Sequence, residues 1–275
     1  MSVDLAGYFD RVNYRGGTEP TLEVLQGLMT AHTGTIPFEN LDPLLGTPVF
    51  DLSPEALTDK LVRRRRGGYC YEQNGLMGSV LAELGFGVRR LAGRVVWMRE
   101  PVAPPPEQTH TMLAVTFPGS GGAYLVDVGF GGQTLTSPIR LETGSVQPTT
   151  HEPYRLEDRG DGLVLQALVR EHWQDLYVFT TQTQPQIDLQ VGCWYVSTHP
   201  SSFFVTSLMT ALITEDARIN LAGRDLAIHR RDGTEKIVLA DAAAVVGALR
   251  ERFGINIDDV GQRALELRIG QILGG

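Results

Sequence analysis

The chain is predicted to be organised around one segment, Arg63-Arg64-Arg65-Arg66-Gly67-Gly68-Tyr69-Cys70-Tyr71-Glu72-Gln73-Asn74 (residues 63–74). Its two glycines are predicted to end one helix and to let the backbone turn sharply. The apolar residues that follow lie on one face of a new helix, which Gly85 and Gly87 close: Leu76, Met77, Val80, Leu81 and Leu84. Cys70 is therefore predicted in the first turn of a core helix, where unpaired N–H groups favour the nucleophilic thiolate.

A lone cysteine also has an ordinary interpretation, as a small buried apolar residue. Cys70 can act as a nucleophile only if the chain supplies a base and a group that orients this base. The second cysteine, Cys193, stands next to Trp194 and is predicted to serve packing alone. Two cysteines make no disulfide framework, so a reducing cytoplasm is the expected location.

The composition is that of an ordinary globular protein. The chain has 275 residues, of which 42% are hydrophobic and 20% charged, and its formal net charge is −8. This balance argues against nucleic acid as a partner, and no apolar run reaches the ~18–20 residues of a membrane span. The one basic run, residues 63–66, is either a solvated helix end or an electropositive wall beside Cys70.

The first part of the chain, residues 1–86, is predicted to be helical. Apolar residues recur at helical spacing from Leu5 onward and again after Thr21. Ser53 and Pro54 supply an N-cap and a first-turn proline for a third helix, which runs into the arginines. Residues 36–43 contain two prolines and are predicted to form a loop.

The next part, residues 87–185, is predicted to be an antiparallel β-barrel. Its strands are expected at residues 88–98, 110–117, 123–128, 163–170 and 173–179, with a glycine-rich turn at residues 118–122. Residues 186–275 form the third part. A linking helix is expected around residues 187–195, strands at 203–213, 226–229 and 236–239, and helices at 241–253 and 258–273.

A hairpin brings two chemically useful side chains together. His110 opens one strand, and the strand that returns across the turn ends at Asp127, so the two residues are predicted to be neighbours. A carboxylate flanked by valines needs a partner. An imidazole N–H supplies one and fixes the histidine tautomer. Cys70 would then complete a set of nucleophile, base and orienting group.

Other interpretations of these residues stay open. His110 alone fits a surface or core histidine, and Asp127 alone fits a strand-end carboxylate. A zinc site made of Cys70, His110 and Asp127 is disfavoured, because the chain has no local ligand pair such as C-x₂-C or H-x₃-H. No P-loop or dinucleotide fingerprint is present. We therefore predict no metal and no permanently bound cofactor.

Four segments resemble the arylamine N-acetyltransferases, and most closely the mycobacterial-type enzymes of actinobacteria. They are Arg-Arg-Gly-Gly-Tyr-Cys-Tyr-Glu-Gln-Asn (65–74), Ile-Pro-Phe-Glu-Asn-Leu (36–41), Thr109-His110 and Val-Asp-Val-Gly-Phe-Gly-Gly (126–132). The resemblance implies an α+β fold of helical bundle, antiparallel β-barrel and C-terminal α/β lid, with a catalytic core like that of transglutaminases and papain-type proteases. It also implies a catalytic triad of Cys70, His110 and Asp127.

The resemblance further implies that acetyl-CoA is the co-substrate. Acetyl would pass to Cys70 and then to an arylamine or arylhydrazine, in a ping-pong reaction with N–H groups at the start of the Cys70 helix as the oxyanion hole. A dry pocket would protect the intermediate, and its expected residues are Phe38, Val95, Trp97, Phe130 and Phe204. The alternative for each of these aromatic residues is an ordinary place in the core. CoA contacts are expected at Thr109, Gly129, Gly131 and His229, with residues 63–66 and 229–231 as options for its phosphates.

Two further functions remain as alternatives at this point. One is a related Cys–His–Asp enzyme, such as an acyltransferase with another acyl-CoA donor, an amide synthase, a transglutaminase or a cysteine protease. The other is a non-catalytic module that binds CoA or aromatic amines. Neither nucleic acid nor a membrane is an expected partner, and a homodimer stays open.

Overall fold

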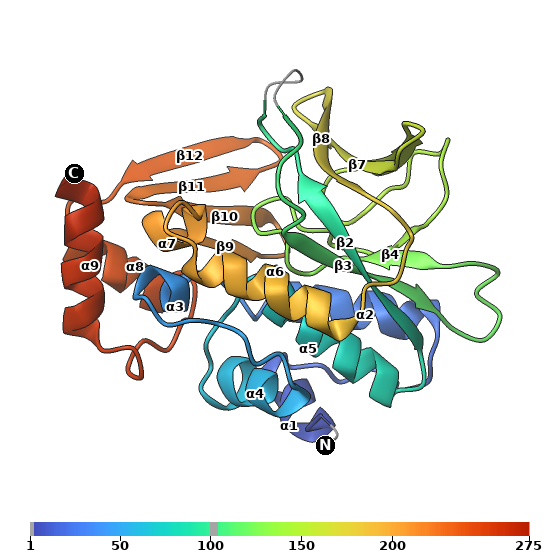
Figure 1. The fold of residues 1–275 in the computed structure, drawn as a ribbon, viewed down its shortest axis with the longest axis horizontal. Coiled ribbons are helices and arrows are strands. Elements are labelled where there is room, and N and C mark those ends of the chain that lie inside the picture. The colour runs from blue at the N-terminus through green and yellow to red at the C-terminus, as the bar shows by residue number, and fades with distance from the viewer. Residues whose placement is uncertain (1–2, 100–103, 275) are drawn as a thin grey trace.

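Helices and antiparallel sheets make up the fold, so the α+β class predicted from the sequence is confirmed (Figure 1). The computed structural model describes residues 3–99 and 104–274. Its helices are α1 (Leu5–Arg11), α2 (Leu22–Thr33), α3 (Leu41–Leu44), α4 (Pro54–Leu57), the π-helix η1 (Thr58–Arg63), α5 (Cys70–Glu83), α6 (Gln186–Thr198), α7 (Phe203–Thr206), α8 (Ala242–Glu251) and α9 (Gln262–Gly274). Within these described ranges, no helix is both long and apolar enough to span a membrane.

The larger sheet is antiparallel and curls into a nearly closed barrel. Along the sheet its strands are β5 (Ile139–Arg140), β4 (Tyr124–Val126), β3 (His110–Thr116), β2 (Gly87–Val95), β8 (His172–Phe179), β7 (Leu163–Val169) and β6 (Tyr154–Asp158). A single bridge between Gln147 and Tyr154 joins the connection after β5 to β6. The β3–β4 hairpin pairs Leu113 with Val126, which carries His110 and Asp127 toward the same end.

The smaller sheet combines segments from distant parts of the chain. Its order is β1 (Phe38–Glu39), β9 (Met209–Ile213), β10 (Ala217–Ala222), β11 (Asp225–Arg230) and β12 (Gly233–Val238). One face packs on α8 and α9 in a separate apolar core that includes Leu221, Leu226, Val245, Leu249 and Leu265. The division of the chain into residues 1–86, 87–185 and 186–275 stays a prediction.

Several elements differ from the sequence prediction. Residues 36–43, predicted as a loop, contain β1 and most of α3, because β1 pairs with the distant β9. Residues 203–206, predicted as strand, form α7. The Ser202 side chain accepts the N–H of Phe204 at 3.3 Å, and this local cap outweighs the β-propensity of the aromatic residues. Strands β5, β6 and β10 were not predicted.

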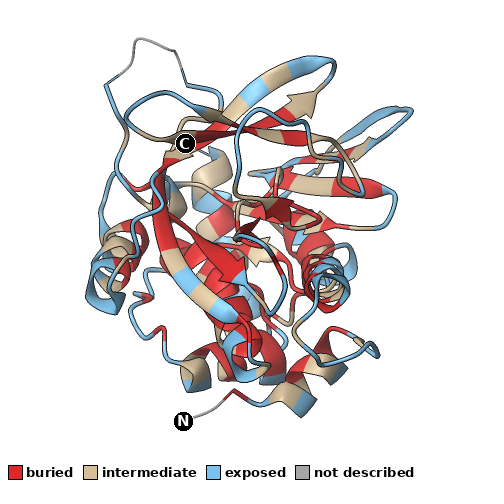
Figure 2. Ribbon diagram, turned by 90° about the vertical axis from the view of Figure 1, so that its right-hand side faces the viewer, coloured by how far each residue is buried: buried red, intermediate tan, exposed pale blue. Residues whose placement is uncertain are grey.

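Helix α5 is the buried centre of the molecule. Every residue from Cys70 to Gly78 is buried, and α5 packs on β2 and β3. Figure 2 shows buried residues concentrated in the central strands and helices, with exposed residues on the outer faces. Position 70 is therefore set by packing on several sides of its helix rather than by one amphipathic face.

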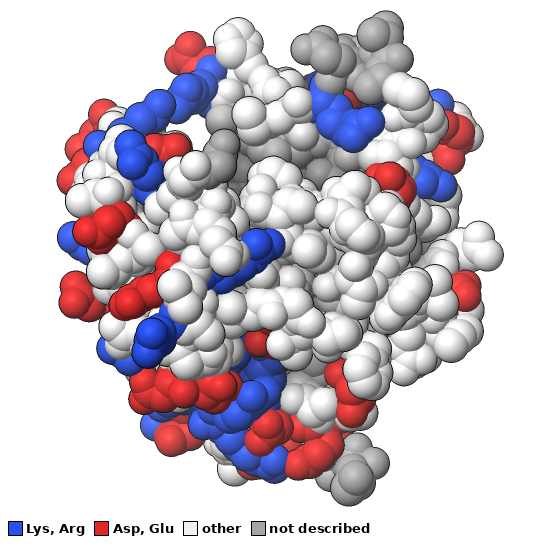
Figure 3. All heavy atoms as spheres, turned by 60° about the vertical axis from the view of Figure 1, so that its left-hand side comes forward, with Lys and Arg blue, Asp and Glu red and all other residues white. Residues whose placement is uncertain are grey.

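Acidic and basic side chains are mixed on the surface. On the face drawn in Figure 3, Lys and Arg lie among Asp and Glu, basic atoms reach the middle of the view, and a large uncharged area lies beside them.

Candidate active site

The glycines before Cys70 have a different purpose from the one predicted. The left-handed residue in this turn is Arg65, with φ 52°, while neither Gly67 nor Gly68 has a positive φ. A Cβ atom on Gly67 would collide with the carbonyl oxygen of Pro37, and one on Gly68 would lie 2.7 Å from the Glu72 carboxylate. Close approach of neighbouring groups, rather than backbone freedom in the turn, therefore requires glycine at both positions.

The first turn of α5 leaves hydrogen-bond donors available beside the thiol. Glu72 accepts the N–H of Tyr69, the N-cap residue, at 3.2 Å. In the part of the chain that the structure describes, the N–H groups of Cys70 and Tyr71 donate to no protein acceptor. These two groups fit the oxyanion hole that the sequence predicted, because a helix start presents N–H groups that can bind a developing negative charge.

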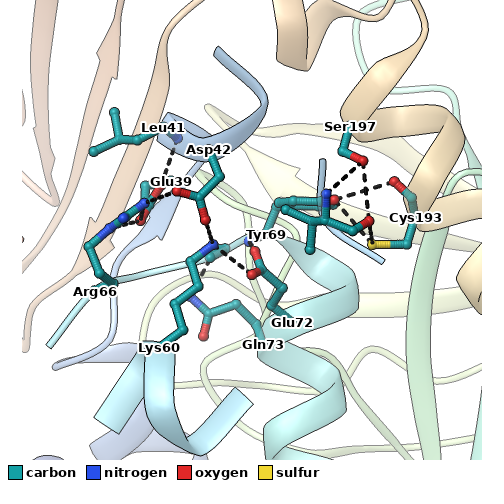
Figure 4. A network of polar contacts seen from close by, with 12 residues as sticks. Glu39, Leu41, Asp42, Lys60, Arg66, Tyr69, Glu72, Gln73, Cys193 and Ser197 are labelled. Atoms are coloured by element: carbon teal, nitrogen blue, oxygen red, sulfur yellow. Dashed lines mark hydrogen bonds and ion pairs between the residues drawn. The ribbon is translucent and has the colours of Figure 1, made fainter. Parts of the chain in front are cut away.

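A buried ionic network lies under this turn (Figure 4). Arg66, which is 1% exposed, pairs with Glu39 at 2.8 Å and with Asp42 at 2.9 Å. Lys60 contacts Asp42 and Glu72, each at 2.6 Å. Burial would lower the pKa of Lys60, but the charge of Glu72, followed by those of Glu39 and Asp42, raises it, so Lys60 stays charged. The network fixes η1, β1 and the start of α5 to one another.

These pairs change the interpretation of the basic run 63–66. Arg63 pairs with Glu55, and Arg64 pairs with Asp59 and Asp259. Arg66 is buried rather than solvated. The electropositive wall is therefore wrong for Arg63, Arg64 and Arg66, since carboxylates offset their charges, and the solvated helix end is wrong for Arg66.

Gln73 ties the glycine turn to the core. Its amide nitrogen donates to the carbonyls of Pro37 (2.8 Å) and Gly68 (3.1 Å), and its oxygen accepts from Nε2 of His32 at 2.6 Å. Nδ1 of His32 can then accept from the Tyr8 hydroxyl at 3.0 Å. Burial lowers the pKa of His32 to about 4, so this histidine is neutral and its tautomer is fixed.

Cys70, His110 and Asp127 come together as the sequence predicted. Nε2–H of His110 donates to Oδ2 of Asp127 at 2.7 Å, and both side chains are buried. The Cys70 thiol is 3% exposed and lies 3.7 Å from the carbonyl of Thr109. Burial would lower the pKa of His110, but the charge and hydrogen bond of Asp127, together with Cys70, raise it to about 10. At neutral pH the imidazole is therefore charged.

Asp127 is held by more than His110. Its Oδ1 accepts from Nδ2 of Asn74 at 2.9 Å and from the N–H of Gly129 at 3.0 Å. Burial raises the pKa of Asp127, but His110 and these hydrogen bonds give a net lowering, so the carboxylate is ionised. The sequence prediction assigned no role to Asn74, although its position four residues after Cys70 places it on the same helix face.

The loop after Asp127 forms one wall of the site. A Cβ on Gly129 would lie 2.6 Å from the Cα of Cys70, so only glycine fits there. The Phe130 ring meets the His110 ring edge-on at 5.2 Å, and Tyr177 contacts the same imidazole at 4.7 Å. The sequence prediction missed Tyr177, because it lies on β8, far from the triad in sequence. Gly131 has φ 85° and lies 3.6 Å from the Phe38 ring, measured from its Cβ position.

The site residues predicted from the sequence that remain are three pocket residues and one CoA contact. The Phe204 ring meets the Phe38 ring edge-on, with centroids 6.1 Å apart, and is tilted against the Tyr69 ring, with centroids 5.1 Å apart. These aromatic rings therefore gather beside the first turn of α5. Val95 pairs with Tyr177 on β8, and half-buried Trp97 follows two residues later.

His229 lies on β11 and its Nδ1 bonds the Thr234 hydroxyl at 2.9 Å, while Arg231 donates to the carbonyl of Thr150. No group of acidic, His and Cys residues in the described ranges could hold a metal ion.

Known proteins resemble this chain over nearly its whole length. A family model described as N-acetyltransferase matches residues 21–261. The chain is 73% identical over 274 residues to an arylamine N-acetyltransferase of Mycobacterium tuberculosis, with 99% of this chain and 97% of the relative covered. The corresponding identity to an arylamine N-acetyltransferase of Mycolicibacterium smegmatis is 59% over 273 residues, with 99% of each covered. The solved structure of Mycobacterium marinum arylamine N-acetyltransferase in complex with CoA matches with a TM-score of 0.96 at 69% identity, over 98% of this chain and 99% of that one.

Proposed function

This chain belongs to the arylamine N-acetyltransferase family, and we propose that it carries acetyl from acetyl-CoA to arylamines and arylhydrazines through an acetyl-cysteine at Cys70. The observation that carries the proposal is the hydrogen bond between His110 and Asp127, at 2.7 Å, beside a buried cysteine at a helix start. The relative from Mycobacterium marinum was solved with CoA, which supports acetyl-CoA as the donor.

The first half-reaction is a thioester exchange. The Cys70 thiolate attacks the acetyl carbonyl, and the N–H groups of Cys70 and Tyr71 bind the oxyanion. The bond to the CoA sulfur breaks, and His110 gives its proton to the departing thiolate. This leaves acetyl-Cys70, free CoA and a neutral imidazole, whose orientation Asp127 maintains.

The second half-reaction reverses the proton movement. The amine attacks acetyl-Cys70, and His110 accepts the proton that the amine loses. The bond from carbonyl carbon to sulfur then breaks, which releases the N-acetylated amine and restores the thiolate beside a charged imidazole. The raised pKa of His110, about 10, favours the charged imidazole between turnovers.

Survival of acetyl-Cys70 requires that water be kept out. We assign this role to Phe38, Val95, Trp97, Phe130 and Phe204, and the contact between Phe130 and His110 supports it for that residue. In this proposal residues 186–275 form an α/β lid over residues 1–86 and 87–185, around a core like that of cysteine proteases and transglutaminases. A Cβ atom on Gly132 would lie 2.8 Å from the side chain of Asn220 on β10, so residues 186–275 come close to the loop after Asp127, which supports such a covering role.

CoA is proposed to bind along Thr109, Gly129, Gly131 and His229. The Thr109 carbonyl lies beside the thiol, and Gly129 and Gly131 bring backbone without a side chain close to Cys70 and Phe38. We further propose that the enzyme holds no permanently bound cofactor and binds no nucleic acid. We also propose that it works in the cytoplasm, since both cysteines are unpaired thiols.

Initial rates test the order of the reaction. Acetyl-CoA and an arylamine or arylhydrazine are varied together, and reciprocal plots should be parallel lines, the sign of a covalent intermediate. Intersecting lines would instead mean direct transfer in a complex of both substrates. Propionyl-CoA and longer donors in the same assay test the alternative of another acyl donor.

A further inference from the structure

Arg218 on β10 is a buried cation with an unusually full set of acceptors. It is 4% exposed. Its Nε and Nη2 donate to the two oxygens of Glu152, at 3.1 and 2.6 Å. Its Nη1 donates to the carbonyls of Gly132 and Thr134, at 3.1 and 3.0 Å. Nothing in the sequence patterns pointed to this residue.

The two carbonyls belong to the loop that walls the active site. The loop, residues 129–134, begins with Gly129 against the Cα of Cys70 and continues with Phe130 against His110. Its other side meets the smaller sheet, because a Cβ on Gly132 would lie 2.8 Å from the Asn220 side chain. Asn220 is two residues from Arg218 on β10, so both point to the same face.

Arginine suits this position for a chemical reason. One planar guanidinium can hold a carboxylate in two places and still donate to two carbonyls, whereas the ammonium of lysine has three donors at a single point. Glu152 supplies the opposite charge that a buried cation needs. The Glu152 pair therefore makes burial of Arg218 tolerable. Nη2 also donates to the Tyr154 hydroxyl at 3.1 Å, and Nη1 is directed at the loop.

We propose that Arg218 is a positioning residue for the reaction, which holds loop 129–134 so that Gly129 and Phe130 keep their places beside Cys70 and His110. The inference rests on the proposed function. It assigns to the smaller sheet a control over acyl-donor binding and over exclusion of water from acetyl-Cys70. Loss of the two carbonyl contacts should loosen the loop without removing any group that touches the reacting atoms.

The test compares Arg218→Lys with Glu152→Gln. Arg218→Lys loses the loop contacts, and we expect KM for acetyl-CoA to rise about tenfold, the effect of one lost charge-assisted hydrogen bond. Release of CoA without amine should rise relative to amine acetylation. Glu152→Gln weakens the ion pair but leaves the carbonyl contacts, so it should lower Tm while KM changes less than twofold.

Arg159→Lys is the matched control, because Arg159 also holds a carboxylate, that of Asp175, with two nitrogens but lies on an exposed hairpin. Its kinetics should equal those of the wild type. Equal effects of Arg218→Lys and Glu152→Gln on both KM and Tm would overturn the proposal, because Arg218 would then serve stability alone. If Arg218→Lys does not fold, the neutral pair Arg218→Gln with Glu152→Gln carries the same expectation for KM.

Hydrogen exchange separates this inference from the proposed function. Amides of residues 129–134 should exchange faster in Arg218→Lys than in Arg159→Lys, whatever reaction the enzyme performs. Unchanged exchange there would refute the positioning role. A wild-type protein that releases no CoA from acetyl-CoA would refute the proposed function, while the exchange result would still decide the role of Arg218.

Discussion

Nε2 of His110 lies 2.7 Å from Oδ2 of Asp127, and the other oxygen of Asp127 accepts from Asn74, which stands one helical turn after Cys70. The carboxylate thus joins the hairpin that carries the base to the helix that carries the nucleophile. Asn74 also donates to the carbonyl of Thr111 at 2.8 Å and accepts the N–H of Val128 at 3.0 Å, so helix and hairpin are joined at several points around Asp127.

Asp127→Asn should keep the shape of the site and lose most of its activity. An amide at position 127 can donate to His110 and so stabilise the wrong tautomer, which costs about 10⁴-fold in kcat in a serine-protease triad. We expect a loss of that order in arylamine acetylation, with an unchanged circular dichroism spectrum. A folded variant with near-normal kcat would show that Asp127 does not orient the base.

The stability of the protein should fall at alkaline pH through His110. The pKa of His110 is raised to about 10, above the ~6.5 of an unfolded chain. A raised pKa in the folded state contributes stability that is complete below pH ~6.5 and is lost as pH rises through the folded value. Urea unfolding at pH 7 and 10 should show a larger loss in the wild type than in His110→Gln. Equal losses would contradict a charged His110.

Gly129→Ala should damage the site by a purely steric route. The added Cβ would lie 2.6 Å from the Cα of Cys70, so loop or helix must move, and misplacement by ~1 Å can cost about 100-fold in rate. Gly247→Ala in α8 is the control, because no atom lies within 4 Å of its Cβ position. We expect kcat/KM to fall only in Gly129→Ala. Similar values in both variants would mean that the loop is not rigidly placed.

Lys60→Met should lower the free energy of unfolding by more than a substitution that breaks an exposed ion pair. The change leaves Arg66 as the one remaining cation of the network beside buried Glu39, buried Glu72 and partly buried Asp42, and an uncompensated buried charge costs about 3–5 kcal/mol. Arg159→Met breaks a largely exposed pair and should cost about 1 kcal/mol or less. In urea unfolding, the double variant Lys60→Met with Glu72→Gln should be more stable than Lys60→Met alone, because one buried charge is removed. Full stability in Lys60→Met would argue against the network.

Local signals account for the parts of the fold that the sequence predicted. The apolar run after Cys70 and the strands around the 118–122 turn are contiguous, so they placed α5 and the His110–Asp127 pair correctly. The elements that were missed depend on distant partners. β1 has two residues and exists because it pairs with β9, and Arg218 acquires its role only where Glu152 and loop 129–134 meet it.

The charges of the arginine run 63–66 were also misjudged because their partners are distant in the sequence. A run of four arginines looks basic in sequence, but its neighbours in space are Glu39, Asp42, Glu55, Asp59 and Asp259, some of them distant along the chain. Asn74 is different, because its spacing of four from Cys70 was visible and only its partner Asp127 was not linked to it. Helical spacing from a predicted nucleophile therefore identifies residues that support the site.

Intact-mass spectrometry after mixing with acetyl-CoA, in the absence of any amine, detects the acetyl-cysteine itself. We expect the wild type to gain the mass of one acetyl group, located at Cys70 by peptide mapping. The adduct should persist in Cys193→Ser, because Cys193 is buried against Tyr69 at 3.1 Å, and should be absent from Cys70→Ser. An unmodified wild type that still acetylates arylamines, or an acetyl group on any other residue, would contradict the covalent mechanism.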